Sequence, residues 1–365
     1  MPPEAPSSGD STRSIRIGND PRVMLLEATS NPLLDSLSAR LTAEGLHVVR
    51  VAAVPTSGKG RFATWRSSLT TAAYGAWHAI RFRRGSVAFH FLHPSSVIIA
   101  TLFAMIGRPF AIHLWGSDFV YWRRRNNWLL RFVLRRARFV SFANTQMLAE
   151  ARTLWGKHVR FRTLRFGLDA IDDLRATPSA SGTRTRPDTL QVVMGTNSQV
   201  AQQHEDMIQA IESLPETTKR RCHFVFPLNY GDRSNRDRVL ARLKQASFRH
   251  SVLDRMILGS QLADFRRSTD VLVQIQTHDA LSGAMLESLY AGARVITGRW
   301  LPYDDLRSQG IDWIEIDHTA ELVAALQTAL DLSIDAGHNR LIVAQLADWQ
   351  QVLPTWVAAY ADLSQ

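Results

Sequence analysis

Two acidic residues, Asp279 and Glu287, stand eight positions apart in the stretch QTHDALSGAMLESLYAGARVITG, residues 276–298. The run DVLVQIQ (270–276) is typical of a buried parallel strand, and SGAMLESLYAG (282–292) is typical of a helix that ends at a glycine. Ligands bind at the carboxyl edge of open α/β sheets, and the free N–H groups that start a helix favour phosphate. We therefore expect the two acids to flank a diphosphate site.

The first turn of this expected helix is made of small residues. Ser282, Gly283 and Ala284 would let a diphosphate approach their backbone amides closely. Asp279 could then accept a hydrogen bond from a hydroxyl on one side of the phosphates, and Glu287 from a hydroxyl on the other. A sugar nucleotide has this order of parts: sugar, diphosphate, ribose. The alternative is that Asp279 or Ser282 only caps the helix and that Glu287 is a solvated helix residue.

A second polar group follows a predicted strand in the first half of the chain, in AIHLWGSDFVYW (111–122). His113 could bind a sugar or deprotonate an acceptor hydroxyl, because the ordinary pKa of histidine is close to neutral pH. Asp118 is the alternative base if the reaction inverts the anomeric configuration. The competing interpretation makes His113 a core residue and Asp118 the cap of a helix from Phe119.

No metal is expected at this site. The sequence has no DxD-type pair and no His/Asp/Glu cluster with convincing ligand spacing. A departing phosphate can itself take the proton of an incoming hydroxyl, so stabilising its developing charge would be the main catalytic contribution. We expect no cofactor other than the nucleotide-diphosphate-sugar, which is a substrate.

The elements that must position these residues follow a strand–helix alternation, which predicts parallel strands joined by helical crossovers. In the first half we predict strands at 22–28, 46–54, 86–92, 109–115 and 138–143 and helices at 32–45, 95–106, 119–136 and 145–155. In the second half we predict strands at 189–195, 222–228, 251–257, 270–276 and 294–298 and helices at 201–213, 234–246 and 282–292. The fold class is therefore α/β, with two Rossmann-like, doubly wound domains that face a central cleft.

The 365 residues suit two domains, and 45% of them are hydrophobic. The expected parts are a disordered tail at 1–20, an acceptor domain at 21–168, a linker at 169–188, a nucleotide-sugar domain at 189–347 and a helix at 348–365 that crosses back to the first domain. The single cysteine, Cys222, fits a reducing compartment. The apolar run 97–106 is about half the length that spans a bilayer, and residues 1–20 lack a signal-peptide core.

Residues 270–300 resemble the C-terminal signature of the GT-B glycosyltransferases, in particular the retaining family 4 type, where an acid, seven residues and Glu precede a run like AGARVI. Asp279 stands where that family usually has Glu. The resemblance implies that Asp279 contacts the transferred sugar, Glu287 the ribose hydroxyls, and the amides of 282–284 the diphosphate. The segments LRFGLD (164–169) and 348–363 resemble the parts of that family that leave the first domain and return to it.

Two further segments, MGTNSQVAQQH (194–204) and FPLNYGD (226–232), resemble the transferases that add 4-acetamido-4,6-dideoxygalactose (Fuc4NAc) to a lipid-linked carrier. This weaker similarity adds five residues to the expected donor-binding set. They are Gly195, Asn197, Ser198, Asn229 and Tyr230.

One departure concerns the diphosphate. The retaining family usually has an Arg and a Lys just after the first strand of its second domain, where this chain has Thr196, Asn197 and Ser198, with His204 further on. Neutralisation is then expected from helix N-termini and from Arg233 or Arg236.

The positive charge is concentrated in one half. Residues 1–180 hold 25 Lys and Arg against 11 Asp and Glu, whereas residues 181–365 hold 18 against 22. The stretches 61–85 and 119–140 carry five and seven arginines, respectively. Neither contains an acidic residue, and both contain several aromatics, which suits an anionic membrane surface. We expect a peripheral enzyme at the cytoplasmic face of the inner membrane that glycosylates a lipid-linked acceptor in bacterial surface polysaccharide or exopolysaccharide synthesis.

Three other functions fit parts of this pattern. A sugar-nucleotide epimerase can share the two-domain architecture, although it has no need of a lipid-facing basic surface. A nucleic-acid-binding protein would use the basic and aromatic residues, but no recognised nucleic-acid motif is present, so no nucleic-acid partner is expected. A degenerate transferase that acts as a scaffold would explain the missing Arg and Lys.

Overall fold

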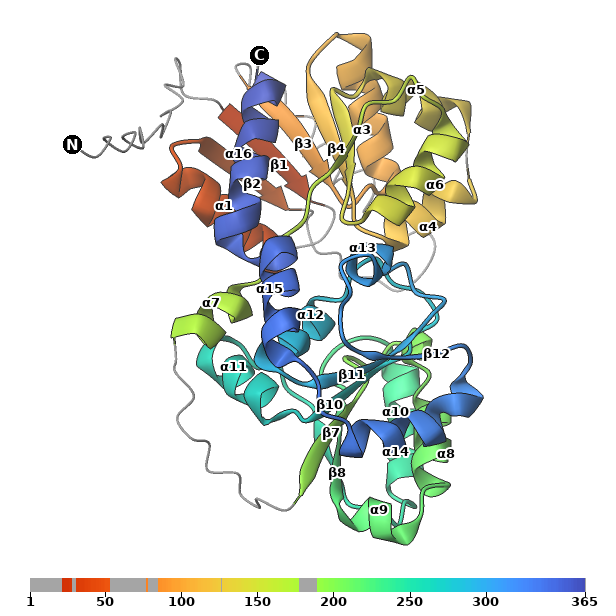
Figure 1. Cartoon of the computed structure of the whole chain (residues 1–365). Coiled ribbons are helices and arrows are strands. Elements are labelled where there is room, and N and C mark those ends of the chain that lie inside the picture. The colour runs from red at the N-terminus through yellow and green to blue at the C-terminus, as the bar shows by residue number, and fades with distance from the viewer. Residues whose placement is uncertain are drawn as a thin grey trace, which may run out of the picture.

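The computed structural model has two lobes, each built around a six-stranded parallel sheet with helices on both faces (Figure 1). This confirms the predicted fold class. The structure describes residues 22–27, 31–52, 77, 85–125, 127–176 and 189–364. The expected tail at 1–20, most of the basic stretch 61–85 and residues 177–188 of the expected linker lie outside the described residues.

The first sheet has the strand order β2-β1-β3-β4-β5-β6, and all of its pairs are parallel. All residues of β3, β4 and β5 are buried, as expected for strands that are covered on both faces. The strands are β1 Arg22–Glu27, β2 His47–Ala52, β3 Ser86–His90, β4 Phe110–Leu114, β5 Phe139–Phe142 and β6 Phe161–Thr163.

The helix expected over 119–136 is in fact two helices. The chain leaves the helical path after Arg123, and Asn127 caps the second helix because its side chain accepts a hydrogen bond from the backbone N–H of Leu130 at 2.8 Å. An apolar period alone did not reveal this break. Among the described residues between β1 and β6, the helices are α1 Pro32–Ala43, α3 Pro94–Met105, α4 Ser117–Arg123, α5 Trp128–Arg136 and α6 Thr145–Trp155.

The second sheet has the order β12-β11-β10-β7-β8-β9, again with parallel pairs. The direction in which successive strands are added reverses between β7 and β10, which are neighbours. Such a reversal leaves a crevice at the carboxyl edge of a doubly wound sheet. The strands are β7 Leu190–Met194, β8 Cys222–Pro227, β9 His250–Leu253, β10 Val271–Gln274, β11 Arg294–Gly298 and β12 Ile314–Ile316.

The segment expected to be an irregular linker begins with a helix, α7, which packs on α11 and α12. Its buried residues, Ala170 and Ile171, form too short a pattern to predict a helix from sequence. The helical elements of the lobe are α7 Asp169–Ala176, η1 Val200–Gln202, α8 His204–Glu212, α9 Glu216–Arg220, α10 Arg233–Leu243, α11 Gly259–Ser268, α12 Gly283–Ala291, α13 Asp304–Arg307, η2 Thr319–Glu321, α14 Leu322–Asp331 and α15 Ala336–Ala347.

The last helix, α16 (Trp349–Ser364), returns to the first lobe and packs beside α1 and β1 (Figure 1). Its Tyr360 is buried between two histidines of the sheet, with its hydroxyl 2.9 Å from His90 Nε2 and 3.2 Å from His113 Nε2. The two imidazole rings stack with their centroids 4.2 Å apart. This cluster joins the end of the chain to the centre of the first sheet.

The histidine cluster predicts a pH-dependent stability. Burial lowers the pKa of His113 to about 3, whereas an unfolded histidine titrates near its ordinary value. When the pH is below the ordinary histidine pKa, His113 therefore binds a proton as the protein unfolds. The free energy of unfolding should then fall as the pH drops, and His113 alone should account for about 2 kcal/mol of this fall at pH 5. Urea unfolding at pH 7 and 5 measures this fall. In His113→Asn, which does not titrate, the fall should be smaller by that amount, and equal falls in both proteins would contradict the assignment.

Candidate active site at the carboxyl edges of the two sheets

The loops that follow β7 and β10 are tied together at the point where the strand order reverses. Thr277 N donates to Ala201 O at 2.8 Å, and Thr196 N donates to Gln202 Oε1 at 3.0 Å. The amide of Gln202 in turn donates to Gln276 Oε1. These bonds hold the two loops as one unit beside the crevice where a doubly wound sheet binds its ligand.

The first turn of α12 begins in this unit. Ser282 is the N-cap, and its hydroxyl accepts from Met285 N at 3.3 Å. The N–H groups of Gly283 and Ala284 have no partner within the helix, so they remain available to a ligand. A methyl group on Gly283 would lie 3.2 Å from Leu168 Cδ2, so a residue that leads out of the first lobe covers part of this turn. All three small residues of the turn are half-buried.

Glu287 lies one turn further along α12, where it is buried and forms an ion pair with Arg266 of α11. Both contacts, from Nε and Nη2 of Arg266 at 2.9 Å, are made to Oε2. Burial raises the pKa of the Glu287 carboxyl, and the guanidinium of Arg266 opposes that shift by favouring the charged form. Arg266 thus fixes the orientation of a carboxylate whose Oε1 has no hydrogen bond to the described part of the chain.

Asp279 lies in the loop before α12 and is half-buried. Its Oδ2 accepts a hydrogen bond from the hydroxyl of Tyr303, which is fully buried. Burial raises the pKa of Asp279, and the Tyr303 hydrogen bond acts in the opposite direction. Sequence reasoning missed Tyr303, because it reaches Asp279 from the segment after β11.

The two segments of the weaker similarity meet at the ends of β7 and β8. Ser198 N and Oγ both donate to Tyr230 O, at 2.8 and 2.7 Å, and Asn197 Nδ2 lies 3.3 Å from the Tyr230 hydroxyl. Gly231, at φ +121°, is required here because a Cβ would lie 2.8 Å from Ser198 Oγ. The structure therefore brings Asn197, Ser198 and Tyr230 together, with the Tyr230 side chain exposed.

The other two residues of that set lie beside this group. Gly195, at φ +75°, is buried, and a Cβ there would lie 2.8 Å from Gln202 Oε1. Asn229 Nδ2 contacts Met256 Sδ at 3.7 Å, whereas its Oδ1 is buried without a hydrogen-bond partner in the described part of the chain. An unpartnered buried amide oxygen is the kind of group that a bound ligand can satisfy.

His204 cannot supply the charge that the missing Arg and Lys would give. It is buried, and burial lowers its pKa to about 4, so the ring is neutral at physiological pH. Among the described residues neither of its ring nitrogens has a hydrogen-bond partner. Arg233 and Arg236 both lie in the first turn of α10, Arg233 exposed and Arg236 half-buried.

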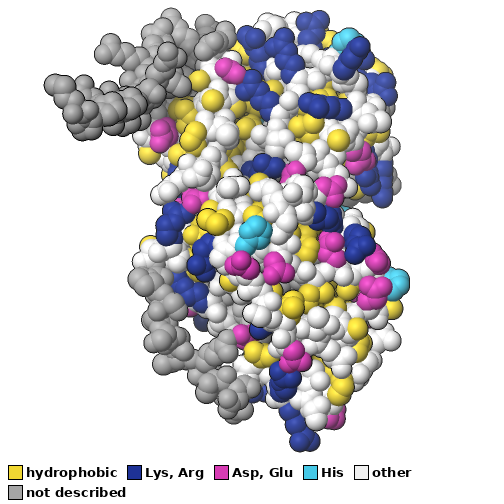
Figure 2. Space-filling model, in the orientation of Figure 1, with side chains coloured by type: hydrophobic (Ala, Val, Ile, Leu, Met, Phe, Trp, Pro, Cys, Tyr) yellow, Lys and Arg dark blue, Asp and Glu magenta, His cyan; other side chains and the backbone are white. Residues whose placement is uncertain are grey.

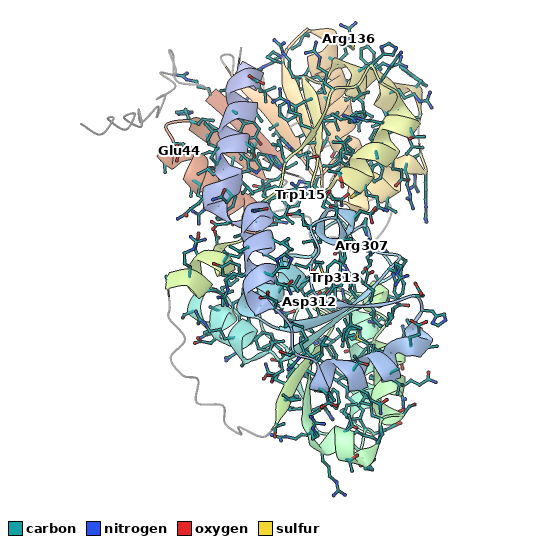
Figure 3. The ribbon with its side chains drawn as sticks, in the orientation of Figure 1. Glu44, Trp115, Arg136, Arg307, Asp312 and Trp313 are labelled. Atoms are coloured by element: carbon teal, nitrogen blue, oxygen red, sulfur yellow. The ribbon has the colours of Figure 1, made fainter. Side chains whose placement is uncertain are left out.

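On the acceptor side, His113 points its polar atoms into the core of the first lobe. Its Nδ1 lies 2.6 Å from Ser141 Oγ, and its Nε2 bonds Tyr360. The small cavity beside it, about 40 Å³, is bordered by Trp115 and Trp356 among others and is too small for a hexose. Figure 3 shows Trp115 at the junction of the two lobes. His113 has no free nitrogen for a substrate in this arrangement.

Asp118 is a buried carboxylate that organises backbone. Oδ1 accepts from the N–H groups of Trp115, Gly116 and Phe119 at 2.8 to 3.0 Å, and Oδ2 accepts from Leu92 N at 2.8 Å. Burial raises the pKa of Asp118 to about 6, and these four hydrogen bonds limit the rise. The helix begins at Ser117, so Asp118 sits in its first turn and fixes the loop that precedes it, and does not cap it from outside.

The two lobes touch through these same loops. Gly116, at φ +135°, packs so closely that a Cβ would lie 2.8 Å from the Cβ of Ala280. The side chain of Asn144, at the start of α6, donates to Ala280 O at 2.5 Å. The structure thus places the loop of Asp118 directly against the loop of Asp279.

A second contact between the lobes centres on Asp305 of α13. It accepts hydrogen bonds from the backbone N–H and the hydroxyl of Thr145, and it pairs with Arg165 at 2.7 Å. Burial would raise the pKa of Asp305, but Thr145 and Arg165 hold it below its ordinary value. Sequence reasoning missed Asp305, because the spacing of its partners along the chain carries no signal.

No group of three or more His, Cys, Asp or Glu residues that could hold a metal ion occurs in the described part of the chain. The groups that could bind a ligand at the junction are therefore backbone amides, hydroxyls, amides and the two carboxylates.

Comparisons with known proteins identify the fold. No protein-family model and no curated protein matches the chain. Among solved structures, sucrose-phosphate synthase of Thermosynechococcus elongatus aligns with a TM-score of 0.72 at 12% identity over 94% of this chain and 99% of that one. A structure described as trehalose-6-phosphate from E. coli bound with UDP-2-fluoro glucose aligns with a TM-score of 0.69 at 12% identity, over 94% of this chain and 99% of that one. HepE of Anabaena in complex with UDP and glucose aligns with a TM-score of 0.66 at 11% identity, over 93% of this chain and 98% of that one. The chain therefore has the two-lobed fold of the GT-B glycosyltransferases.

The Asp305 contact predicts a variant whose lobes are less tightly joined. Asp305→Ala removes the ion pair and the hydrogen bonds to Thr145, which together stabilise the contact between the lobes by about 1.5–3 kcal/mol. Small-angle scattering should then give a larger radius of gyration than for the unmodified protein. Asp304→Ala is the matched control, because Asp304 pairs with Arg307 inside the same lobe. An unchanged radius in Asp305→Ala would contradict this role.

Proposed function

We propose that the chain transfers a sugar from a nucleotide-diphosphate-sugar to a hydroxyl of an acceptor glycan. The observation that carries this proposal is the first turn of α12, which follows β10 where the strand order reverses and lies between Asp279 and Glu287 along the chain. The likeness to structures bound with UDP and sugars supports it, since the fold is the same. In this proposal the diphosphate binds to the amides of Ser282, Gly283 and Ala284, where the helix dipole favours negative charge.

Glu287 then accepts hydrogen bonds from the ribose hydroxyls through Oε1, while Arg266 keeps its other oxygen fixed. Arg266 is a positioning residue, because it acts through Glu287. The rest of the nucleotide lies over the group at the ends of β7 and β8. That group consists of Gly195, Asn197, Ser198, Asn229 and Tyr230.

Asp279 lies on the other side of the diphosphate, where its Oδ1 accepts a hydrogen bond from a hydroxyl of the sugar. Its Oδ2 accepts the hydrogen bond from the Tyr303 hydroxyl. The bond between the anomeric carbon and the phosphate oxygen breaks, and the nucleoside diphosphate leaves with the electron pair. The acceptor oxygen bonds to the same carbon, and its proton passes to the departing phosphate. The transfer would thus retain configuration and need no metal, because the α12 amides stabilise the phosphate charge.

His113 and Asp118 serve the acceptor side of this proposal. Their polar atoms are occupied within the protein, so both act as positioning residues for the loop at Trp115 and Gly116, which faces Ala280. If the reaction inverted, Asp118 would have to leave its four backbone hydrogen bonds to act as a base.

The acceptor in this proposal is a lipid-linked glycan at the cytoplasmic face of a bacterial membrane, as in surface polysaccharide synthesis. The excess of arginine in the first lobe supports it, because a diphosphate-linked lipid and its membrane are both anionic. An epimerase is the second candidate, since Asp279 with Tyr303 could also handle protons at a sugar.

Replacing Glu287 tests the donor site. Glu287→Gln keeps a partner for Arg266, whereas alanine would leave that guanidinium buried alone. We expect about 10- to 100-fold weaker binding of the nucleotide by calorimetry, from the loss of charged hydrogen bonds of about 1.5–3 kcal/mol. Asp279→Asn should instead lower turnover more than donor affinity. Asp264→Asn, an exposed change on the helix of Arg266, is the control. Unchanged binding in Glu287→Gln would rule out this site.

A nucleotide-sugar panel tests the function. The protein should convert one nucleotide sugar to free nucleoside diphosphate and a heavier lipid-linked glycan, detected by mass spectrometry, only when a lipid-linked acceptor extract is present. An isomerised nucleotide sugar formed without acceptor would identify an epimerase instead. Binding of every nucleotide sugar without any product would favour the scaffold.

A further inference from the structure

A pocket lined by three arginines lies at the end of the first lobe away from the candidate active site. Arg108, Arg136 and Arg138 border a space of about 190 Å³ together with Ala104, Gly107 and Pro109. These residues precede β4 and β5, so the pocket is at the amino edge of the sheet, whereas the loop of Asp118 is at the carboxyl edge. Figure 3 shows Arg136 at the far end of the lobe from Trp115.

Two of the arginines lie against aromatic rings, and Arg136 and Arg138 are exposed to solvent. Arg108 Nη2 donates to Gly85 O at 3.2 Å, and its guanidinium lies 5.1 Å from the ring centroid of Phe103. Arg136 lies over Phe132 at 5.6 Å. Burial lowers the pKa of Arg108. No acid among the described residues forms an ion pair with Arg136 or Arg138, so an external anion can neutralise them.

An apolar stripe runs along α3 to this pocket. Ile98, Leu102, Met105 and Ile106 recur at helical spacing, and they are 51%, 50%, 71% and 69% exposed. In the sequence, Met105 and Ile106 lie between Ala104 and Gly107, which both line the pocket. The twelve residues of α3 include no charged side chain, whereas the exposed face of an ordinary surface helix carries charged and polar residues.

The neighbouring helix adds charge and a large aromatic side chain. α5 packs against α3, begins with Trp128, which is 77% exposed, and contains three arginines and no acid. Figure 2 shows Lys and Arg side chains gathered over the first lobe with hydrophobic side chains among them. No helix in the described part of the chain is long and apolar enough to cross a membrane.

We infer that this face docks on an anionic phospholipid bilayer. A headgroup phosphate occupies the pocket of Arg108, Arg136 and Arg138, and the stripe on α3 enters the boundary between headgroups and acyl chains. An α-helix of twelve residues is about 18 Å long, and α3 runs from the carboxyl edge of the sheet to the pocket. A bilayer along α3 therefore extends toward the edge where the acceptor loops lie. The inference rests on the membrane location in the proposed function and names the surface that makes the contact, and its test requires no sugar donor.

Flotation of the full chain with vesicles tests the inference without any nucleotide. We expect binding to vesicles of phosphatidylglycerol and phosphatidylcholine and not to phosphatidylcholine alone. The double variant Arg136→Ser and Arg138→Ser should bind about 30-fold more weakly, because each basic residue near an anionic surface contributes about 1 kcal/mol to binding. The double variant Met105→Gln and Ile106→Gln should also release the protein, although it keeps the charge.

The control variant, Arg220→Ser with Arg238→Ser, removes two exposed arginines from the second lobe and should leave vesicle binding unchanged. Equal loss in this control would show that only net charge matters and would overturn the inference. Binding that inorganic phosphate abolishes and that ignores Met105 and Ile106 would identify a free-anion pocket instead. Tighter binding to an oligonucleotide than to the vesicles would also overturn it. Failure of sugar transfer would leave this result unaffected.

Discussion

The connection from β10 to α12 is the constraint on which the candidate site depends. A buried parallel strand delivers the chain to the carboxyl edge of the sheet, next to β7, where the strand order reverses. The helix that follows presents unpaired N–H groups at that point, because the first turn of any α-helix lacks acceptors for them. Small residues at 282–284 keep the turn partly accessible. Asp279 and Glu287 owe their positions to this one turn.

The two lobes are joined by more than a linker. The Gly116–Ala280 packing, the Asn144 hydrogen bond and the Asp305 contacts all lie where the carboxyl edges of the sheets meet. The last helix, α16, joins the lobes a second time, since Tyr360 binds two histidines in the centre of the first sheet. The polar atoms of His113 and Asp118 are engaged inside the first lobe. His113 contacts Ser141 and Tyr360, and Asp118 accepts four backbone hydrogen bonds.

The predictable part of the site is the part that is local in sequence. The strand, the loop acid, the N-cap at Ser282 and the helix ending at Gly292 are all encoded within 270–298, and the structure has each of them. The partners of these residues could not be predicted. Arg266 reaches Glu287 from a neighbouring helix, and Tyr303 reaches Asp279 from the segment after the next strand. Nothing in residue type or spacing distinguishes these two from the chain's other arginines and tyrosines.

The sequence by itself determined the α/β class and the strand–helix alternation, because hydrophobic periodicity and helix caps act over a few residues. It also determined that positive charge is concentrated in the first half. Only the tertiary structure decided which polar groups are free. Burial keeps His113 and His204 neutral, Leu92 of a distant segment donates to Asp118, and Arg266 of another helix pairs with Glu287. Packing also left the apolar face of α3 exposed beside three arginines. Such contacts join residues that are far apart along the chain, and so no local pattern contains them.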